Sequence, residues 1–220
     1  MSTLDLLRAD RVLTVVRAPE ISDARDLCAA LVAGGIHVVE LTYTTPDLPR
    51  HLERAASTAA ETGAVVGAGT VQTGAQAKQA IDAGAQFLVT PGQGPDAAAI
   101  AETARGAGIP VILGAFTPSE VMTALALGSD AVKIFPAHQL GPKYFKDLNG
   151  PFPGVPLVPS GGINAGNARD YLAAGALAVS AGTDVVSPAD VAAANWDTIT
   201  AKAQAFCAAL LDSDAAVAGP

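Results

Sequence analysis

The chain has 220 residues, of which 50% are hydrophobic and 15% charged. This composition excludes disordered and fibrous proteins and supplies enough apolar residues for a sizeable core. The formal net charge is −8, from 13 Lys and Arg against 21 Asp and Glu. An acidic chain argues against nucleic acid or an anionic membrane as the partner, because both select for basic surfaces.

A repeated junction between helix and strand organises the chain from end to end. At each junction a Gly follows an Ala- or Leu-rich segment and precedes a short apolar run. The junctions are AGGIHVVEL (from Ala33), AGAQFLVTP (Ala83), GAGIPVILG (Gly106), LGSDAVKIFP (Leu127) and AGALAVSAG (Ala174). Gly ends a helix by taking the left-handed conformation, and an unbroken apolar run is typical of a strand covered on both faces of a parallel sheet.

Filling the gaps between these junctions predicts eight strands and eight helices, with a short additional helix before the first strand. The expected strands lie near residues 11–17, 36–43, 64–70, 86–91, 109–115, 130–136, 156–160 and 177–182. The expected helices lie near residues 20–33, 46–61, 74–83, 95–106, 118–127, 141–149, 165–174 and 189–212. Pro118, Pro142, Asn164 and Pro188 mark the starts of the last four helices.

Alternating strands and helices without a linker predict an α/β protein with a single (β/α)8 TIM-barrel domain over residues 1–220. The residues after about 212 are expected to be loose. An open doubly wound sheet is the alternative, but no GxGxxG motif opens the first unit. The first residues do not form a signal peptide and no apolar run is long enough to span a bilayer, so we expect a cytoplasmic protein with no membrane partner.

Lys133 is the most unusual residue at the C-terminal end of a predicted strand, where such barrels place their active sites. Alternation along AVKIFPA directs Ala131, Lys133 and Phe135 into the barrel and Val132 and Ile134 toward the helices. Burial favours the neutral amine form of a lysine, which can attack a ketone and form a Schiff base. The alternative is a lysine whose stem crosses the strand and whose head reaches solvent at the rim.

Glu40 is the matching residue on the second strand. In HVVELTY, Val38, Glu40 and Thr42 share one face of the strand. A carboxylate inside the barrel can act as a general acid and base, or it can form a structural ion pair with Lys133 or Arg17. A buried lysine and a buried carboxylate together are the minimum set for Schiff-base chemistry at a carbon–carbon bond.

Two glycine-bearing loops indicate a phosphate site. Ser160, Gly161 and Gly162 follow the seventh predicted strand, and Gly182 and Thr183 follow the eighth. Glycine loops leave backbone N–H groups free to point at an anion, and the loops after strands 7 and 8 commonly bind phosphate in this architecture. The alternative is that these glycines only form tight turns.

The two cysteines, Cys28 and Cys207, lack metal-ligand spacing and are expected to be unreactive core residues. The three histidines are scattered along the chain. No metal site is expected from this pattern.

Seven motifs, in order over roughly residues 10–190, resemble the class I 2-keto-3-deoxy-6-phosphogluconate (KDPG)/4-hydroxy-2-oxoglutarate (KHG) aldolase family. They are AGGIHVVELTYTTPD, VVGAGTV, GAQFLVTPG, AVKIFPA, GPKYFKDLNGPFP, VPSGGIN and AVSAGT. The resemblance implies a (β/α)8 barrel that forms a homotrimer and needs neither a metal nor another cofactor. It also implies that Lys133 forms the Schiff base and that Glu40 is the general acid and base.

The same resemblance assigns the rest of the pocket. Thr70 and Pro91 match residues near the substrate, and Phe135 is expected beside them. The residues matching the phosphate-binding loops are Gly161, Gly162, Gly182 and Thr183, with Ser160 preceding them.

One position departs from the family pattern. Many members carry an arginine two residues after the threonine of the strand 2 motif, where it helps to hold the substrate, and this chain has Thr44 there. Arg17, at the end of the first strand, is available in its place. We hypothesise that Arg17 binds the carboxylate of the substrate, because a guanidinium forms paired hydrogen bonds with a carboxylate.

The expected reaction is cleavage of KDPG, or of a close phosphorylated keto-deoxy sugar acid, into pyruvate and glyceraldehyde 3-phosphate. Cleavage of KHG to pyruvate and glyoxylate, or of 2-keto-3-deoxy-6-phosphogalactonate, is the alternative within the same chemistry. Outside that chemistry, the barrel could be an acid–base isomerase or synthase, or a non-catalytic phospho-ligand sensor. Neither of these would form an imine.

Overall fold

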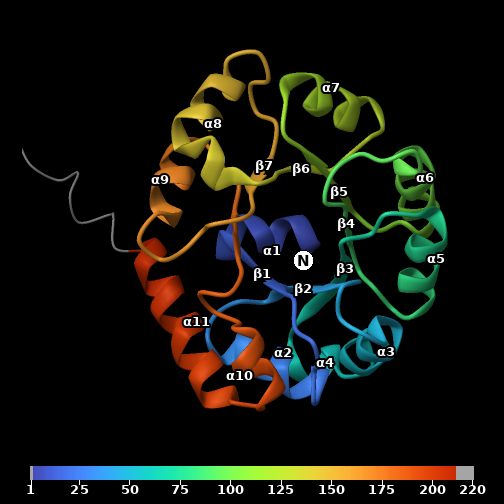
Figure 1. Ribbon diagram of the computed structural model, residues 1–220, viewed down its shortest axis with the longest axis vertical. Coiled ribbons are helices and arrows are strands. Elements are labelled where there is room, and N and C mark those ends of the chain that lie inside the picture. The colour runs from blue at the N-terminus through green and yellow to red at the C-terminus, as the bar shows by residue number, and fades with distance from the viewer. Residues whose placement is uncertain (1, 212–220) are drawn as a thin grey trace, which may run out of the picture.

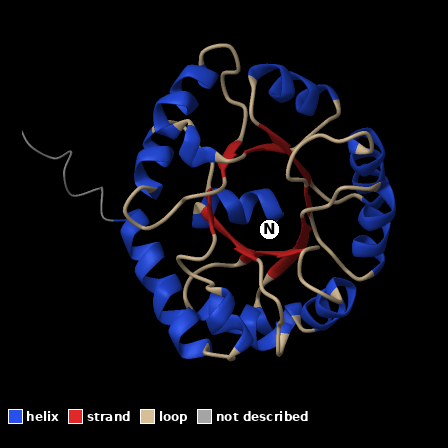
Figure 2. Ribbon diagram, in the orientation of Figure 1, coloured by secondary structure: helices blue, strands red, loops and turns tan. Residues whose placement is uncertain are grey.

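The computed structural model describes residues 2–211 and confirms the predicted (β/α)8 barrel. Eight parallel strands form a ring that helices surround (Figure 2). The sheet runs in the order β7-β6-β5-β4-β3-β2-β1-β8. Between its two end strands, the backbone N–H of Leu177 donates to the carbonyl of Leu157 at 2.8 Å, which joins the ends of the sheet. The predicted loose end after about residue 212 lies outside the described residues.

All eight predicted strands are present. They are β1 (Val12–Val16), β2 (Val38–Thr42), β3 (Val65–Gly69), β4 (Leu88–Val89), β5 (Val111–Ala115), β6 (Ala131–Ile134), β7 (Leu157–Pro159) and β8 (Val179–Ala181). β4 is much shorter than the predicted 86–91. The backbone N–H of Gly114 on β5 donates to the Thr90 hydroxyl rather than to a backbone carbonyl, so the ladder between β4 and β5 ends there.

The helices lie outside the ring, except for α1. They are α1 (Thr3–Asp10), α2 (Ala24–Ala33), α3 (Leu48–Ser57), α4 (Ala59–Thr62), α5 (Gly74–Asp82), α6 (Ala97–Ala107), α7 (Pro118–Ala126), α8 (Gly141–Asn149), α9 (Ala168–Ala173), α10 (Pro188–Ala192) and α11 (Trp196–Leu211), with a 3₁₀ turn at Ala137–Gln139. None of these described helices is both long and apolar enough to cross a membrane.

Two predicted helices are each split in two. The prediction 46–61 divides into α3 and α4 at Thr58, whose hydroxyl donates to two carbonyls of the preceding turn and competes with the backbone ladder. The prediction 189–212 divides into α10 and α11. Ala194 there adopts a φ of 55°, and the side-chain amide of Asn195 donates to a carboxylate on α10.

Two other predicted helices begin later than expected. α2 begins after Asp23, whose carboxylate accepts the N–H of Arg25 and caps the helix. Asn164 does not start α9. Its side chain instead accepts the N–H of Gly166, and α9 begins only at Ala168. The prolines predicted at the starts of α7, α8 and α10 do lie in their first turns.

The apolar core has two layers, one inside the ring and one between the strands and the surrounding helices. The buried residues of the inner layer are Leu6, Leu7, Leu13, Val38, Phe87, Val89, Ile112, Ala131, Val158 and Ala178. Leu6 and Leu7 belong to α1, which crosses the middle of the ring in Figure 1 and closes its amino-terminal end. The carboxyl ends of the strands are therefore the end at which the barrel can open.

Candidate active site

A cavity of about 630 Å³ lies at the carboxyl ends of the strands. Apart from Glu40, every predicted site residue lines it. These residues are Arg17, Thr44, Thr70, Pro91, Lys133, Phe135, Ser160, Gly161, Gly162, Gly182 and Thr183. The predicted residues come from strands and loops far apart in the sequence, and the barrel brings them around one space.

Lys133 and Glu40 meet inside the barrel. Lys133 Nζ lies 3.6 Å from Glu40 Oε1, and the two side chains are only 7% and 1% exposed. The lysine head therefore does not reach bulk solvent at the rim. The alternative interpretation of Lys133, a stem that crosses the strand and a solvated head, is wrong. Val132 and Ile134 pack in the helix-facing layer, as the alternation predicts. The ring of Phe135 has its centroid 5.8 Å from the amine.

The Glu40 carboxylate has little support besides this ion pair. Neither of its oxygens has a hydrogen-bond partner among the described residues. A buried carboxylate without hydrogen bonds is costly, so the fold is holding a proton acceptor next to the amine at the expense of stability. Space for it comes from Gly69 on β3, since a Cβ at that position would overlap the Glu40 carboxylate.

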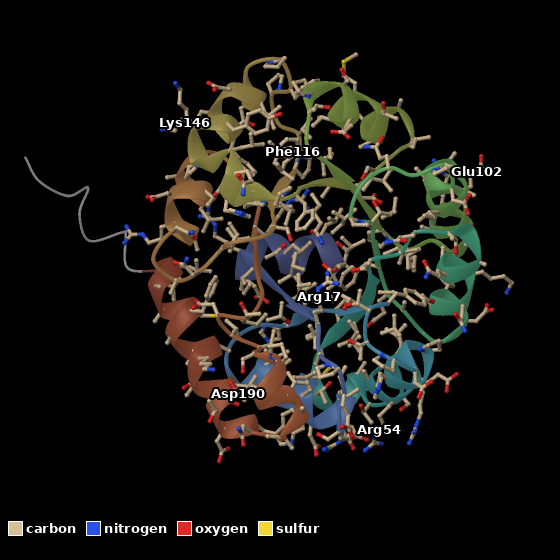
Figure 3. All side chains as sticks on the ribbon, viewed as in Figure 1. Arg17, Arg54, Glu102, Phe116, Lys146 and Asp190 are labelled. Carbon is tan, nitrogen blue, oxygen red and sulfur yellow. The ribbon has the colours of Figure 1, made fainter. Side chains whose placement is uncertain are left out.

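Arg17 is held at the cavity by hydroxyl groups. Its Nη1 donates to Thr44 Oγ1 at 2.8 Å and its Nη2 to Thr70 Oγ1 at 3.3 Å. The Thr42 hydroxyl donates to the carbonyl of Val16 at 2.9 Å, so it accepts from Thr44 across their 2.8 Å contact. The hydroxyl protons of Thr44 and Thr42 therefore both point away from the guanidinium. Thr44 orients Arg17, and the remaining guanidinium N–H groups have no partner among the described residues and are left for a ligand. Figure 3 shows Arg17 over the middle of the ring.

The two glycine loops present unused donors. None of the hydrogen bonds in the described part of the chain uses the backbone N–H of Gly161, Gly162, Gly182 or Thr183. Gly161 and Gly162 adopt φ values of 89° and 75°, a conformation that favours glycine. The ring of Phe135 also packs against Gly161, where a Cβ would come within 3.2 Å of it. This geometry supplies N–H donors of the kind that bind a phosphate.

Six cavity residues were missed from the sequence. They are Val15, Gln72, Ile163, Ser180, Val186 and Pro188. Strand alternation could have found Val15, two positions before Arg17, and Ser180, two positions before Gly182. Of the other four, Gln72, Ile163 and Val186 lie in loops, for which periodicity carries no signal, and Pro188 is the first residue of α10.

The cysteines are remote from this chemistry. Burial raises the pKa of the Cys28 thiol to about 12 and that of Cys207 to about 11, so both are thiols at neutral pH. Within residues 2–211, no group of three or more His, Cys, Asp and Glu side chains is placed to hold a metal ion.

Comparison with known proteins gives one consistent result. The family described as KDPG and KHG aldolase matches residues 4–202. The 2-dehydro-3-deoxy-phosphogluconate aldolase of Treponema pallidum (strain Nichols) is 35% identical over 205 residues, which cover 93% of this chain and 95% of that protein. The KHG/KDPG aldolase of Escherichia coli (strain K12) is 34% identical over 200 residues, covering 90% and 92%.

A solved structure agrees with these relatives. The KDPG aldolase from Legionella pneumophila, captured with pyruvate as a covalent carbinolamine intermediate, is 34% identical to this chain. It superposes with a TM-score of 0.84 over 94% of this chain and 98% of that one.

The contact between Gly69 and Glu40 makes a prediction about stability. Gly69→Ala should lower the free energy of unfolding by about 1–3 kcal/mol, because the added methyl group overlaps the buried Glu40 side chain from its Cγ to its carboxylate. In a Glu40→Ala background the same change should cost much less, since its clash partner is gone. Chemical denaturation of the four proteins measures this coupling.

Gly106→Ala is the matched control. A Cβ at Gly106 meets nothing within 4 Å, and the residue lies in the last turn of α6. This change should stabilise the protein by about 0.5–1 kcal/mol. An equal cost of Gly69→Ala in both backgrounds would contradict the packing argument.

Proposed function

This chain belongs to the KDPG and KHG aldolase family and is a carbon–carbon lyase, and we propose that it cleaves KDPG, or a close phosphorylated keto-deoxy sugar acid, into pyruvate and glyceraldehyde 3-phosphate. The observation that carries this proposal is the buried pair of Lys133 and Glu40, 3.6 Å apart, beside a cavity lined by two glycine loops. No cofactor takes part in the mechanism proposed below.

The first step joins the substrate to the enzyme. Glu40 takes a proton from Lys133, and the neutral amine attacks the C2 ketone to give a carbinolamine. Loss of the C2 oxygen as water, with protons supplied from Glu40, leaves a protonated imine. Because Glu40 lies behind the amine and does not line the cavity, its protons reach the substrate through a water molecule.

The second step breaks the carbon–carbon bond. Glu40 takes the proton of the C4 hydroxyl through water, the C3–C4 electron pair flows into the imine, and the aldehyde leaves. The enamine that remains is protonated at C3. Attack of water on the resulting imine then releases pyruvate and restores the free amine of Lys133.

The ends of the substrate have separate partners. Arg17, oriented by Thr44 and Thr70, binds the carboxylate next to the imine carbon. The loops at Gly161 and Gly182 bind the phosphate with their unused N–H groups. Because the chain carries a net charge of −8, these local groups, and not the overall field, attract the anionic substrate.

The glycine loops also favour a phosphorylated substrate over KHG, which has no phosphate for them to bind.

We place the enzyme in the cytoplasm, because both of its cysteines are free thiols, as is usual in a reducing compartment.

We further propose that three copies of the chain assemble into a homotrimer. Three apolar side chains on and before α7 support an interface there. Phe116, Met122 and Leu125 are 37%, 61% and 37% exposed, and the last two, three residues apart, share one face of the helix.

Two measurements test the reaction. Pyruvate release should be fastest with KDPG or its phosphogalactonate epimer, and kcat/KM for KHG should be lower by at least about tenfold, because the phosphate contacts are lost.

Treatment with pyruvate and borohydride should add a reduced pyruvyl group to Lys133. Lys133→Met should abolish this adduct and lower kcat by about 10³-fold or more.

Lys143→Met is the control for the trapping experiment, since Lys143 is an exposed lysine on α8. This variant should retain full activity and the adduct. An unmodified Lys133 peptide in the wild-type protein would overturn the Schiff-base mechanism, and a preference for KHG would overturn the phosphate assignment.

Removal of the guanidinium tests the carboxylate site. Arg17→Ala should lower kcat/KM by about 10- to 100-fold, the range expected when a charged group loses its hydrogen-bond partner. Thr44→Val keeps the charge but frees the side chain, so we expect a smaller loss. Arg54→Ala, at the outer rim of the barrel in Figure 3, is the control and should leave kcat/KM unchanged. An unchanged KM in Arg17→Ala would remove Arg17 from the site.

Light scattering tests the trimer. The wild-type protein should have about three times the chain mass of 21.9 kDa. Replacing Met122 and Leu125 together by Glu should lower this mass, because buried charges would oppose association. Leu211→Glu changes an apolar residue that is 76% exposed elsewhere, on α11, and should have no effect. A monomeric wild-type protein would exclude the trimer.

A further inference from the structure

The hydroxyl of Ser180 is a buried polar group to which the mechanism above gives no role. Ser180 lies on β8, is 4% exposed and lines the cavity. Its Oγ has no hydrogen-bond partner among the described residues. A buried hydroxyl without a partner costs about 1–3 kcal/mol. Its parallel neighbour on β1, Leu13, is apolar and offers the hydroxyl no side-chain partner.

The position of Ser180 along β8 indicates which part of a substrate it meets. Ser180 and Gly182 are two residues apart and face the same side of the strand, so the serine lies about 7 Å deeper than the phosphate loop. A six-carbon acid held by its phosphate at that loop and by its imine at Lys133 has its middle carbons between these two points. The Ser180 hydroxyl lines the same cavity below the phosphate loop.

The two ends of the substrate already have partners. Arg17, which donates hydrogen bonds to Thr44 and Thr70, is the proposed partner of the carboxylate. The backbone N–H groups of the glycine loops are the proposed partners of the phosphate. The hydroxyl groups of the middle carbons are the substrate's other polar atoms. After cleavage they belong to the aldehyde half, which carries the phosphate.

We propose that the Ser180 hydroxyl hydrogen-bonds a hydroxyl group on the aldehyde half of the substrate and thereby contributes to the choice of sugar acid. The inference rests on the proposed cleavage of a phosphorylated keto-deoxy acid, and it names a substrate-contacting residue of that same cavity. Ser180 makes no contact with the pyruvate half. A bound substrate supplies the hydrogen-bond partner that Ser180 Oγ lacks among the described residues.

Ser180→Ala is the test. We expect kcat/KM for KDPG cleavage to fall about tenfold, the factor that corresponds to one hydrogen bond of ~1.4 kcal/mol. The rate of borohydride trapping with pyruvate should stay unchanged, since pyruvate lacks the aldehyde half. The unfolding temperature should be equal to or above that of the wild type, because the variant no longer buries an unpartnered hydroxyl.

Thr14→Val is the matched control. The Thr14 hydroxyl is also buried and without a partner, but the residue shares its face of β1 with Val12 and Val16, which pack against the helices. This variant should match Ser180→Ala in stability and retain the wild-type kcat/KM.

Two results would overturn the proposal for Ser180. One is a Ser180→Ala enzyme with unchanged kcat/KM for KDPG. The other is a parallel loss of pyruvate trapping, which would show that the hydroxyl acts on the lysine or on the pyruvate half. Wild-type protein in the same assay separates this failure from the larger one. If it released no pyruvate from any phosphorylated acid, the proposed function would fall and this inference with it.

Discussion

The ion pair between Lys133 and Glu40 lies inside the barrel, where both side chains are almost fully buried. Burying two charges costs more than their attraction returns unless further hydrogen bonds support them, and the carboxylate here has no such bonds among the described residues. The apolar inner layer and α1 close the amino-terminal end of the barrel, beneath the pair. The proposed chemistry moves a proton from the amine to the carboxylate, because only a neutral amine attacks a ketone.

Small residues make room for this pair. Gly69 lets the Glu40 carboxylate lie against β3, and Gly67, two residues earlier, lies under the ring of Phe87, which a Cβ would approach within 2.5 Å. One strand therefore accommodates a bulky aromatic side chain in the floor of the barrel and an acidic side chain above it. The two glycines of the GAGTV motif are therefore explained by packing between β3 and the side chains of Glu40 on β2 and Phe87 beside β4.

The substrate recognition proposed for the mouth of the cavity relies on neutral groups as well as charge. Arg17 takes its orientation from the hydroxyls of Thr44 and Thr70, both of which accept from its guanidinium. The glycine loops contribute backbone N–H groups. Because such groups are fixed by the fold, they bind an anion without loss of side-chain freedom, and an acidic protein can still select an acidic substrate.

The sequence by itself determined the barrel, because unbroken apolar runs and the helix-ending glycines at five junctions are local signals that recur along the chain. It also placed Lys133 and Glu40 on the inner faces of their strands, since side-chain direction in a strand has a period of two. Only the tertiary structure decided that these residues meet at 3.6 Å, that Thr44 serves Arg17, and that Ser180 lacks a partner. Such facts depend on the stagger between strands distant in sequence, which no local pattern encodes.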